Sequence, residues 1–251
     1  KQRPTPANLH LNYPSTRMAL TMKTVCLAAV LVSASALQIS TGDANVCTCL
    51  NWKDVYSNYG MSCESQGEEF CSGFFMHMSG NLCVNQGIGA GDLATEYCFV
   101  SSACQQLNGG KQESAQIAKK FCTEADDRLV DKTPTEIDAL CAKDDLDRGL
   151  VVKMAYVTPG QTRWNSAKTY FTTGSTNLAT KQIGELAAVQ ESGSRTVIDS
   201  RDGHPPFAVV DGSKVYEVKM NMGYAIGQKI LGRSLFEHPR RLNTMTCVSG
   251  C

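Results

Sequence analysis

The chain of 251 residues is 42% hydrophobic and 19% charged, which is typical of a folded globular protein and excludes a disordered or fibrous one. Basic and acidic residues both number 24, so a basic field of the kind that binds nucleic acid is not expected. The twelve cysteines exceed what an ordinary cytosolic chain of this length carries.

The amino-terminal end has the layout of an export signal. Lys23 precedes an apolar run at 25–32 and a group of small residues that ends at Ala36. This run is too short to cross a bilayer, which takes about twenty apolar residues. We therefore expect a leader or non-native extension at 1–17, a signal peptide at 18–36, and a secreted protein or another secretory-pathway destination, with no membrane span.

Charge and cysteine content change together in the polar stretch 143–148. Residues 37–145 carry 16 acidic and 7 basic groups, whereas residues 146–251 carry 8 acidic and 13 basic groups. Nine cysteines lie in the first segment, and the second has none until its last five residues. These shifts predict an α+β protein with a cysteine-rich acidic module at 37–145 and an α/β module at 146–236. The tail at 237–251 has no clear element pattern and looks like a truncated or frame-shifted end.

The first module is expected to be a loop-rich disulfide scaffold, because it has many turn residues and few long apolar runs. Its nine cysteines are Cys47, Cys49, Cys63, Cys71, Cys83, Cys98, Cys104, Cys122 and Cys141. Their pairing cannot be deduced from spacing, and the odd number leaves one thiol free or bonded to a second chain. Local patterns predict short helices at 67–77, 112–122 and 135–142. Thr133-Pro134 would open the last helix, with Glu136 in its first turn.

A metal site is the alternative use for these cysteines. Cys47 and Cys49 are too closely spaced for the usual zinc knuckle, and no second close pair with a nearby histidine completes a site. A thioredoxin-type redox pair would have two residues between its cysteines instead of one. We therefore expect disulfides and no metal.

Several segments between residues 45 and 125 share the pattern of a known group of proteins. They are CTCLNWK from residue 47, GEEFCSGFF from 67, NLCVN from 81, YCFVSSAC from 97 and LNGG from 107. Here the chain resembles a cysteine-rich module of secreted microalgal proteins of the dinoflagellate type. The resemblance implies secretion and disulfides, and it implies no activity.

The second module has the patterning of a small α/β domain. Its expected elements are strands at 150–157 (LVVKMAYV) and 168–172 (KTYFT), a helix at 175–190, strands at 196–199, 207–210 and 214–218, and a helix at 222–235. Ser175 or Thr176 would cap the first helix, and Gly193 would end it. Asp211-Gly212 is the strongest local signal and predicts a hairpin between the last two strands.

From Lys168 onward, the order of elements is strand, helix, strand, strand, strand and helix, with Pro205-Pro206 just ahead of the hairpin. This order resembles a thioredoxin-like domain, and more closely the amino-terminal half of glutathione transferases. The resemblance implies that Pro206 is cis and that glutathione is the cofactor. It also implies a catalytic hydroxyl from Tyr170, Thr172 or Ser175.

The chain departs from the transferase pattern at three places. Val218 stands after Glu217, where the family has a serine that helps to hold glutathione. No Cys-x-x-Cys opens the helix near Ser175, and too few residues follow position 235 for the family's all-helical second half. These departures weaken the expectation of transferase activity more than the expectation of the fold.

The string DSRDGH at 199–204 contains two acids, a serine and a histidine, as a hydrolase site does. Such a site is assembled from separate elements, and adjacent loop residues cannot adopt its geometry. We therefore interpret this string as a polar turn bent at Asp202-Gly203.

Two functions from different classes follow from these patterns. The first is a secreted or surface-associated, disulfide-stabilised binding or structural protein without a cofactor. Its partner would be a glycan or a protein, and its candidate binding residues are Trp52, Tyr56, Tyr97 and Pro206. The second is a secreted thiol-linked enzyme, or a degenerate relative of one, that acts with glutathione through the second module.

Overall fold

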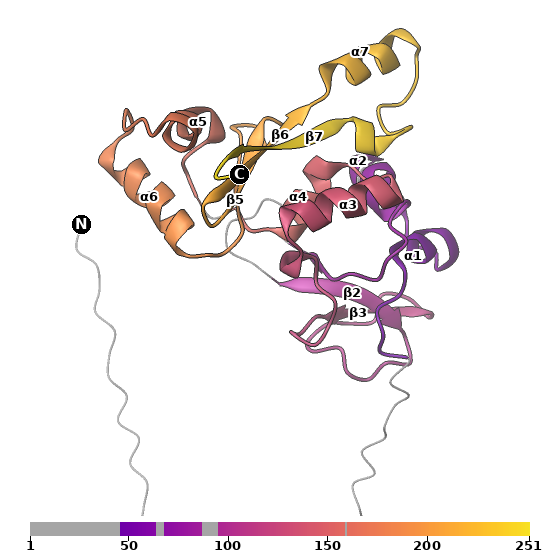
Figure 1. Cartoon of the computed structure of the whole chain (residues 1–251). Helices are drawn as coiled ribbons and strands as arrows, with labels where there is room; N and C mark the ends of the chain where they lie inside the picture. The colour runs from indigo at the N-terminus through magenta and orange to yellow at the C-terminus, as the bar shows by residue number, and fades with distance from the viewer. Residues whose placement is uncertain (1–45, 64–67, 87–94, 159) are drawn as a thin grey trace, which may run out of the picture. The chain divides into compact units, whose positions relative to one another are not determined.

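The computed structural model describes residues 46–63, 68–86, 95–158 and 160–251, which belong to one unit of the chain, Thr41–Cys251. The expected leader and signal peptide, at 1–36, lie outside these residues. Helices are mixed with two antiparallel sheets, as the predicted α+β class requires (Figure 1). None of the helices in the described part has both the length and the hydropathy needed to span a bilayer.

A three-stranded sheet forms in the cysteine-rich region, in the order β1, β2, β3. Its strands are β1 (Val84–Asn85), β2 (Glu96–Ser101) and β3 (Ile117–Phe121). The prediction of a helix at 112–122 is therefore wrong. The Ser114 hydroxyl accepts hydrogen bonds from the backbone N–H groups of Gln116 and Ile117, and this turn leads the chain into the ladder with β2.

Local signals predicted the helices of this region better than its strands. The helices are α1 (Trp52–Asn58), α2 (Glu68–Phe70), which continues as the π-helix η2 (Cys71–Phe75), the 3-10 turn η3 (Leu129–Asp131), and α3 (Pro134–Asp144). The helix predicted within 67–77 is present over 68–75. At the start of α3, the Glu136 carboxylate accepts from Thr133 N at 2.7 Å while Thr133 Oγ1 accepts from Glu136 N at 3.3 Å. This capping box confirms the predicted start.

A buried helix, α4 (Arg148–Ala155), occupies the segment where a strand was predicted at 150–157. Its residues from 149 to 155 are all buried, so the helix has no exposed polar face and its sequence shows no helical period. An apolar run of this kind fits a helix or a strand equally well. The Asp147 carboxylate caps the helix by accepting from Leu150 N at 2.9 Å, which favours the helix.

The second half of the described chain forms a four-stranded antiparallel sheet, in the order β4, β5, β6, β7. Its strands are β4 (Thr196–Ile198), β5 (Phe207–Asp211), β6 (Lys214–Met220) and β7 (Asn243–Ser249). The predicted hairpin is confirmed, since Asp211 pairs with Lys214 and Gly212 has a φ of +59°. β7 and the 3-10 turn η4 (Pro239–Arg241) lie in the segment 237–251, where no element was expected.

Helices accompany this sheet at three places. They are α5 (Trp164–Thr173), α6 (Thr180–Glu191) and α7 (Met222–Ile230). α5 shows that the predicted strand at 168–172 is wrong. α6 begins after Ala179, later than the predicted caps Ser175 and Thr176, and it ends before Gly193, as expected. Because the first expected strand is a helix and all four strands are antiparallel, the thioredoxin-like arrangement is not confirmed.

The second sheet separates two apolar cores, because its side chains alternate between its two faces. Val197 and Val209 belong to a large core that also contains Trp52 of the cysteine-rich region. Val210 packs with Trp164 in a smaller core against α5 and α6. The large core therefore includes residues from both sides of the polar stretch at 143–148. The division into two modules at that stretch stays a prediction.

Candidate functional site

Disulfides hold the cysteine-rich region together, as expected. The pairs among the described residues are Cys47–Cys104, Cys49–Cys98, Cys63–Cys71, Cys83–Cys122 and Cys247–Cys251. The odd cysteine is Cys141, which is completely buried in α3. Burial raises the pKa of its thiol, so a disulfide to a second chain through Cys141 would first require α3 to open.

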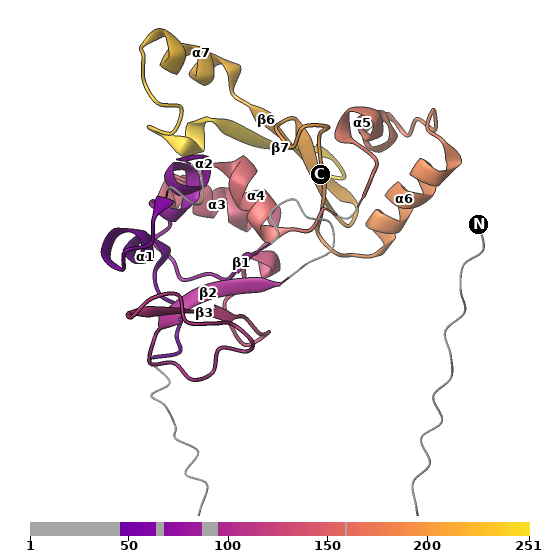
Figure 2. The ribbon, with the colours of Figure 1, turned by 180° about the vertical axis from the view of Figure 1, so that it is seen from behind.

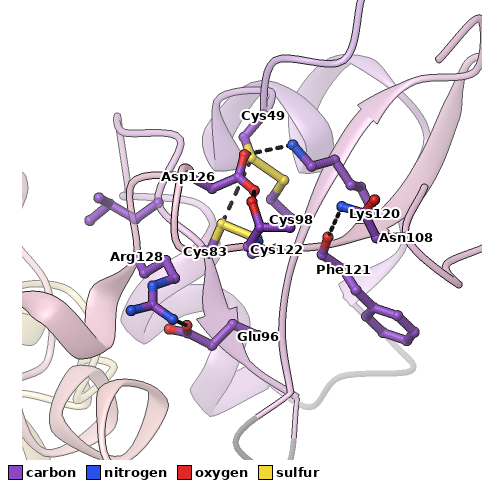
Figure 3. The surroundings of a disulfide bond; sticks show 12 residues. Cys49, Cys83, Glu96, Cys98, Asn108, Lys120, Phe121, Cys122, Asp126 and Arg128 are labelled. Carbon is purple, nitrogen blue, oxygen red and sulfur yellow. Dashed lines mark hydrogen bonds and ion pairs between the residues drawn. A yellow bond between two sulfur atoms is a disulfide. The ribbon is translucent and has the colours of Figure 1, made fainter. Parts of the chain in front are cut away.

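Two of these disulfides pack against each other beside the first sheet (Figure 3). The four sulfur atoms of Cys49, Cys83, Cys98 and Cys122 lie within 4.8 Å of one another, and Cys49 Sγ is 3.9 Å from Cys83 Sγ. β2 carries Cys98, and Cys122 directly follows β3. The antiparallel pairing of β2 with β3 therefore places the disulfides Cys49–Cys98 and Cys83–Cys122 next to each other. We call this group the cystine cluster.

The spacing of the cystine cluster resembles that of a four-cysteine metal centre. Metal ions bind the thiolate form of cysteine, and the four sulfurs are here bonded in pairs. The same atoms would offer thiolate ligands only if both disulfides were reduced. Sequence spacing gave no sign of this grouping, because its members come from four separate segments.

A partly buried ion pair lies beside the cystine cluster. Lys120 Nζ is 2.6 Å from Asp126 Oδ1 and also donates to the backbone oxygen of Cys47 at 3.3 Å. Burial alone would raise the pKa of Asp126, but hydrogen bonds from Lys120 and from the Thr123 backbone hold it below its ordinary value. The pair therefore presents fixed opposite charges next to the disulfides.

A second carboxylate, Glu96 of β2, lies on the other side of the cystine cluster (Figure 3). Burial raises the pKa of Glu96 to about 7, although the Val130 N–H and the Arg128 guanidinium oppose this rise. Arg128 Nη1 is 3.6 Å from Glu96 Oε2, and its other nitrogens bind Asp131 more closely. Glu96 therefore changes its charge near neutral pH.

A cavity of about 570 Å³ opens over the cystine cluster. Its walls include Cys47, Cys49, Asn81, Gln106, Lys120 and Asp126. Four separate parts of the chain thus meet here, and two disulfides fix the segment that carries Cys47 and Cys49. The walls offer amide, ammonium and carboxylate groups, which can both donate and accept hydrogen bonds.

The predicted aromatic binding residues lie mainly in the large core. Trp52 is fully buried and donates its Nε1–H to Leu82 O at 2.7 Å. Tyr56 is stacked on Phe75, and burial raises the pKa of Tyr56. Tyr97 is partly exposed, with Lys119 Nζ 4.1 Å from its ring centre. These side chains fill the core between α1 and β2 instead of forming one exposed platform.

Pro206, the fourth predicted binding residue, is exposed and follows a cis peptide bond, as expected. It lines a cavity of about 320 Å³ together with Lys168 and Glu217. Burial alone would raise the pKa of Glu217, but hydrogen bonds from Lys168, Lys219 and Trp164 hold it below its ordinary value.

The candidate catalytic hydroxyls of the transferase alternative lie on α5 or just after it. Tyr170 packs edge-on against Phe171 at 5.1 Å between ring centres. Thr172 donates its hydroxyl to Lys168 O of its own helix at 2.8 Å. Ser175 accepts from Asn177 N at 3.4 Å. These contacts serve the helix and the turn that follows it.

A buried lysine that sequence analysis did not select lies near the string 199–204. Lys153 Nζ is 2.9 Å from Asp199 Oδ1 and 4.7 Å from the ring centre of Phe207, and it also donates to Gly203 O. It is the single charge within the apolar run LVVKMAYV, which is a signal for a buried, paired group. Asp202 accepts from the Ser200 hydroxyl at 2.9 Å, as expected for the polar turn.

These sites rest on geometry alone. Comparison of the chain with protein-family models, with curated proteins and with solved structures found no match. The cavity over the cystine cluster is the candidate functional site, because it combines a fixed wall with several kinds of hydrogen-bonding group.

Proposed function

We propose that the chain is an exported, disulfide-stabilised binding protein, and that the cavity over the cystine cluster binds a glycan. One observation carries this proposal. A cavity of about 570 Å³ is lined by polar side chains, and its wall contains two cysteines that are each bonded to another strand or loop.

The rigidity of the wall supports a binding role. Cys47 is bonded to Cys104 and Cys49 to Cys98, so the segment between them is held at both ends. Lys120 reaches the Cys47 carbonyl from β3. A wall that is ordered before the ligand arrives loses little conformational entropy on binding.

The chemistry of the wall favours a ligand with many hydroxyl groups. A sugar hydroxyl both donates and accepts, and the cavity supplies donors at Lys120 and acceptors at Asp126. The amides of Asn81 and Gln106 are exposed and can do both. Disulfides in this number are typical of proteins that leave the cytosol, which supports the proposed export.

The transferase-like alternative gains no support from the described residues. Its first strand is the helix α5, and Tyr170, Thr172 and Ser175 make local contacts there. We therefore keep the binding function as the proposal.

A glycan array followed by calorimetry tests this proposal on the oxidised protein. We expect at least one glycan to bind, and Gln106→Ala to weaken its binding. The matched control is Gln105→Ala, because Gln105 is an equally exposed neighbour that does not line the cavity. Absence of any glycan ligand, or equal losses in both variants, would contradict the proposal.

Removing one disulfide at a time provides a second controlled test of glycan binding at this cavity. Removal of Cys47–Cys104 by alanine substitution should reduce glycan binding, because it frees one end of the wall. Removal of Cys247–Cys251 should leave glycan binding unchanged, because those residues do not line the cavity.

A further inference from the structure

Helix α7 presents apolar side chains to solvent. Met222, Ile226, Ile230 and Leu231 are 59%, 52%, 78% and 63% exposed. The first three are spaced four residues apart, so they lie along one face of the helix. The usual surface helix of a folded protein buries this face and exposes its polar side chains.

Two polar side chains of α7, Tyr224 and Gln228, are turned inward instead. The Tyr224 hydroxyl donates to Leu235 O at 3.2 Å and accepts from His238 N at 3.1 Å. Gln228 is buried and donates to Ser234 O at 2.8 Å and to Glu237 Oε2 at 2.9 Å. These hydrogen bonds tie α7 to the segment that returns to β7, and they fix the apolar face outward.

The apolar face is bordered by basic residues. A hollow of about 440 Å³ on it is lined by Met222, Ile226, Lys229 and Arg233 among others. Arg233 lies 3.5 Å from Glu237 in a solvent-exposed ion pair, and no ion pair of Lys229 is found among the described residues. Figure 2 shows that α7 follows directly from the end of β6. The surface therefore combines exposed apolar side chains with two basic side chains, Lys229 and Arg233.

We propose that α7 docks the protein on a lipid bilayer that contains anionic headgroups. Apolar side chains of an interfacial helix enter the boundary between headgroups and acyl chains, while flanking cations pair with the headgroups.

Four apolar side chains and a few cations form a small docking surface. Binding should therefore be reversible and should weaken as salt rises, since salt screens the attraction between the cations and the headgroups. This docking is independent of the proposed glycan cavity, which lies over the cystine cluster and shares no residue with α7.

Co-sedimentation of the full oxidised chain with vesicles tests the proposal. We expect binding to vesicles of phosphatidylcholine mixed with phosphatidylglycerol, little binding to phosphatidylcholine alone, and release at high salt. Ile226→Asp combined with Ile230→Asp should abolish the binding. Lys229→Gln should weaken it by about fivefold, since one cation near an anionic surface contributes about that factor.

The matched control is Met76→Asp, because Met76 is 48% exposed and lies outside α7. It should bind vesicles as the unaltered chain does, and circular dichroism should show that every variant is folded. Binding that is equally strong to charged and uncharged vesicles, or that is unchanged by the double aspartate substitution, would overturn the proposal. A dimer on size exclusion that the double substitution dissociates would overturn it in favour of a second copy.

Discussion

The two sheets each bury a glutamate, and the two carboxyl groups have opposite surroundings. In the three-stranded sheet, Glu96 has one cation at 3.6 Å, and burial raises its pKa to about 7. In the four-stranded sheet, Glu217 lies 2.8 Å from Lys168 and 2.7 Å from Lys219, and its pKa is lowered despite burial. The carboxylate of the first sheet thus has one cation at a longer distance, whereas that of the second sheet has two cations close to it.

The same two regions also differ in what stabilises them. Disulfides join the strands and loops around the first sheet. The second sheet instead has an apolar core on each face, and its one disulfide, Cys247–Cys251, closes a short loop. The cysteine-rich region therefore combines its share of the large core with covalent links, whereas the second sheet depends on its two apolar cores.

Removal of a disulfide should show the largest difference between the regions. Cys83 and Cys122 are 39 residues apart, so replacing both by alanine should lower the unfolding free energy by about 4 kcal/mol. Cys247 and Cys251 are only four residues apart, and their removal should cost about 2 kcal/mol. Denaturant unfolding of the oxidised variants measures both losses. Equal losses would contradict the expectation that the disulfide closing the longer loop contributes more to the unfolding free energy.

Stability should depend on pH through Glu96. Its folded pKa of about 7 lies above the ordinary 4.5, so the folded state binds the proton more tightly. The unfolding free energy should therefore fall as pH rises from about 4.5 to about 7, by up to about 3 kcal/mol. Glu96→Gln should remove much of this fall in denaturant titrations at several pH values.

Glu217 should make the unfolding free energy depend on pH in the opposite direction. Its folded pKa is lowered, so its contribution is present above the ordinary 4.5 and is lost as pH falls through the folded pKa. Glu217→Gln should therefore reduce stability at neutral pH and have less effect in acid. If both glutamine variants showed the same pH dependence, the contrast between the two sheets would be wrong.

The smallest effects should come from two glycines near the second sheet. Gly212 has a φ of +59° in the β5–β6 hairpin, and an added Cβ would meet no atom within 4 Å. Gly212→Ala should therefore cost about 1 kcal/mol through backbone strain alone. Gly184 lies inside α6 with equally open surroundings, and Gly184→Ala should stabilise by about 0.5–1 kcal/mol. Thermal unfolding should show shifts of opposite sign.

Elements that depend on neighbouring residues were predictable from the sequence. Thr133-Pro134 and Glu136 define the start of α3, and Asp211-Gly212 defines the hairpin, because the hydrogen bonds and dihedral angles involved are local. α4 and α5 were not predicted. α4 is buried on all sides and shows no helical period, and the buried residues of α5 begin at Trp164 and Ala167, before the segment KTYFT that suggested a strand.

The candidate site could be predicted only in part. The cysteine count indicated a disulfide scaffold, but eight paired cysteines allow 105 pairings and the sequence does not choose among them. The cavity arises because Cys49, Gln106 and Lys120 are brought together by that pairing and by the β2–β3 ladder. Such contacts between distant residues are set by the tertiary structure and leave no local pattern.

Non-reducing peptide mapping of the purified oxidised protein tests the cystine cluster most directly. We expect peptides that link Cys49 to Cys98 and Cys83 to Cys122, with Cys141 alkylated only after unfolding. The four sulfurs are close enough for the other pairings to form. Links between Cys49 and Cys83 and between Cys98 and Cys122 would contradict the disulfide pairing that forms the wall of the proposed glycan cavity.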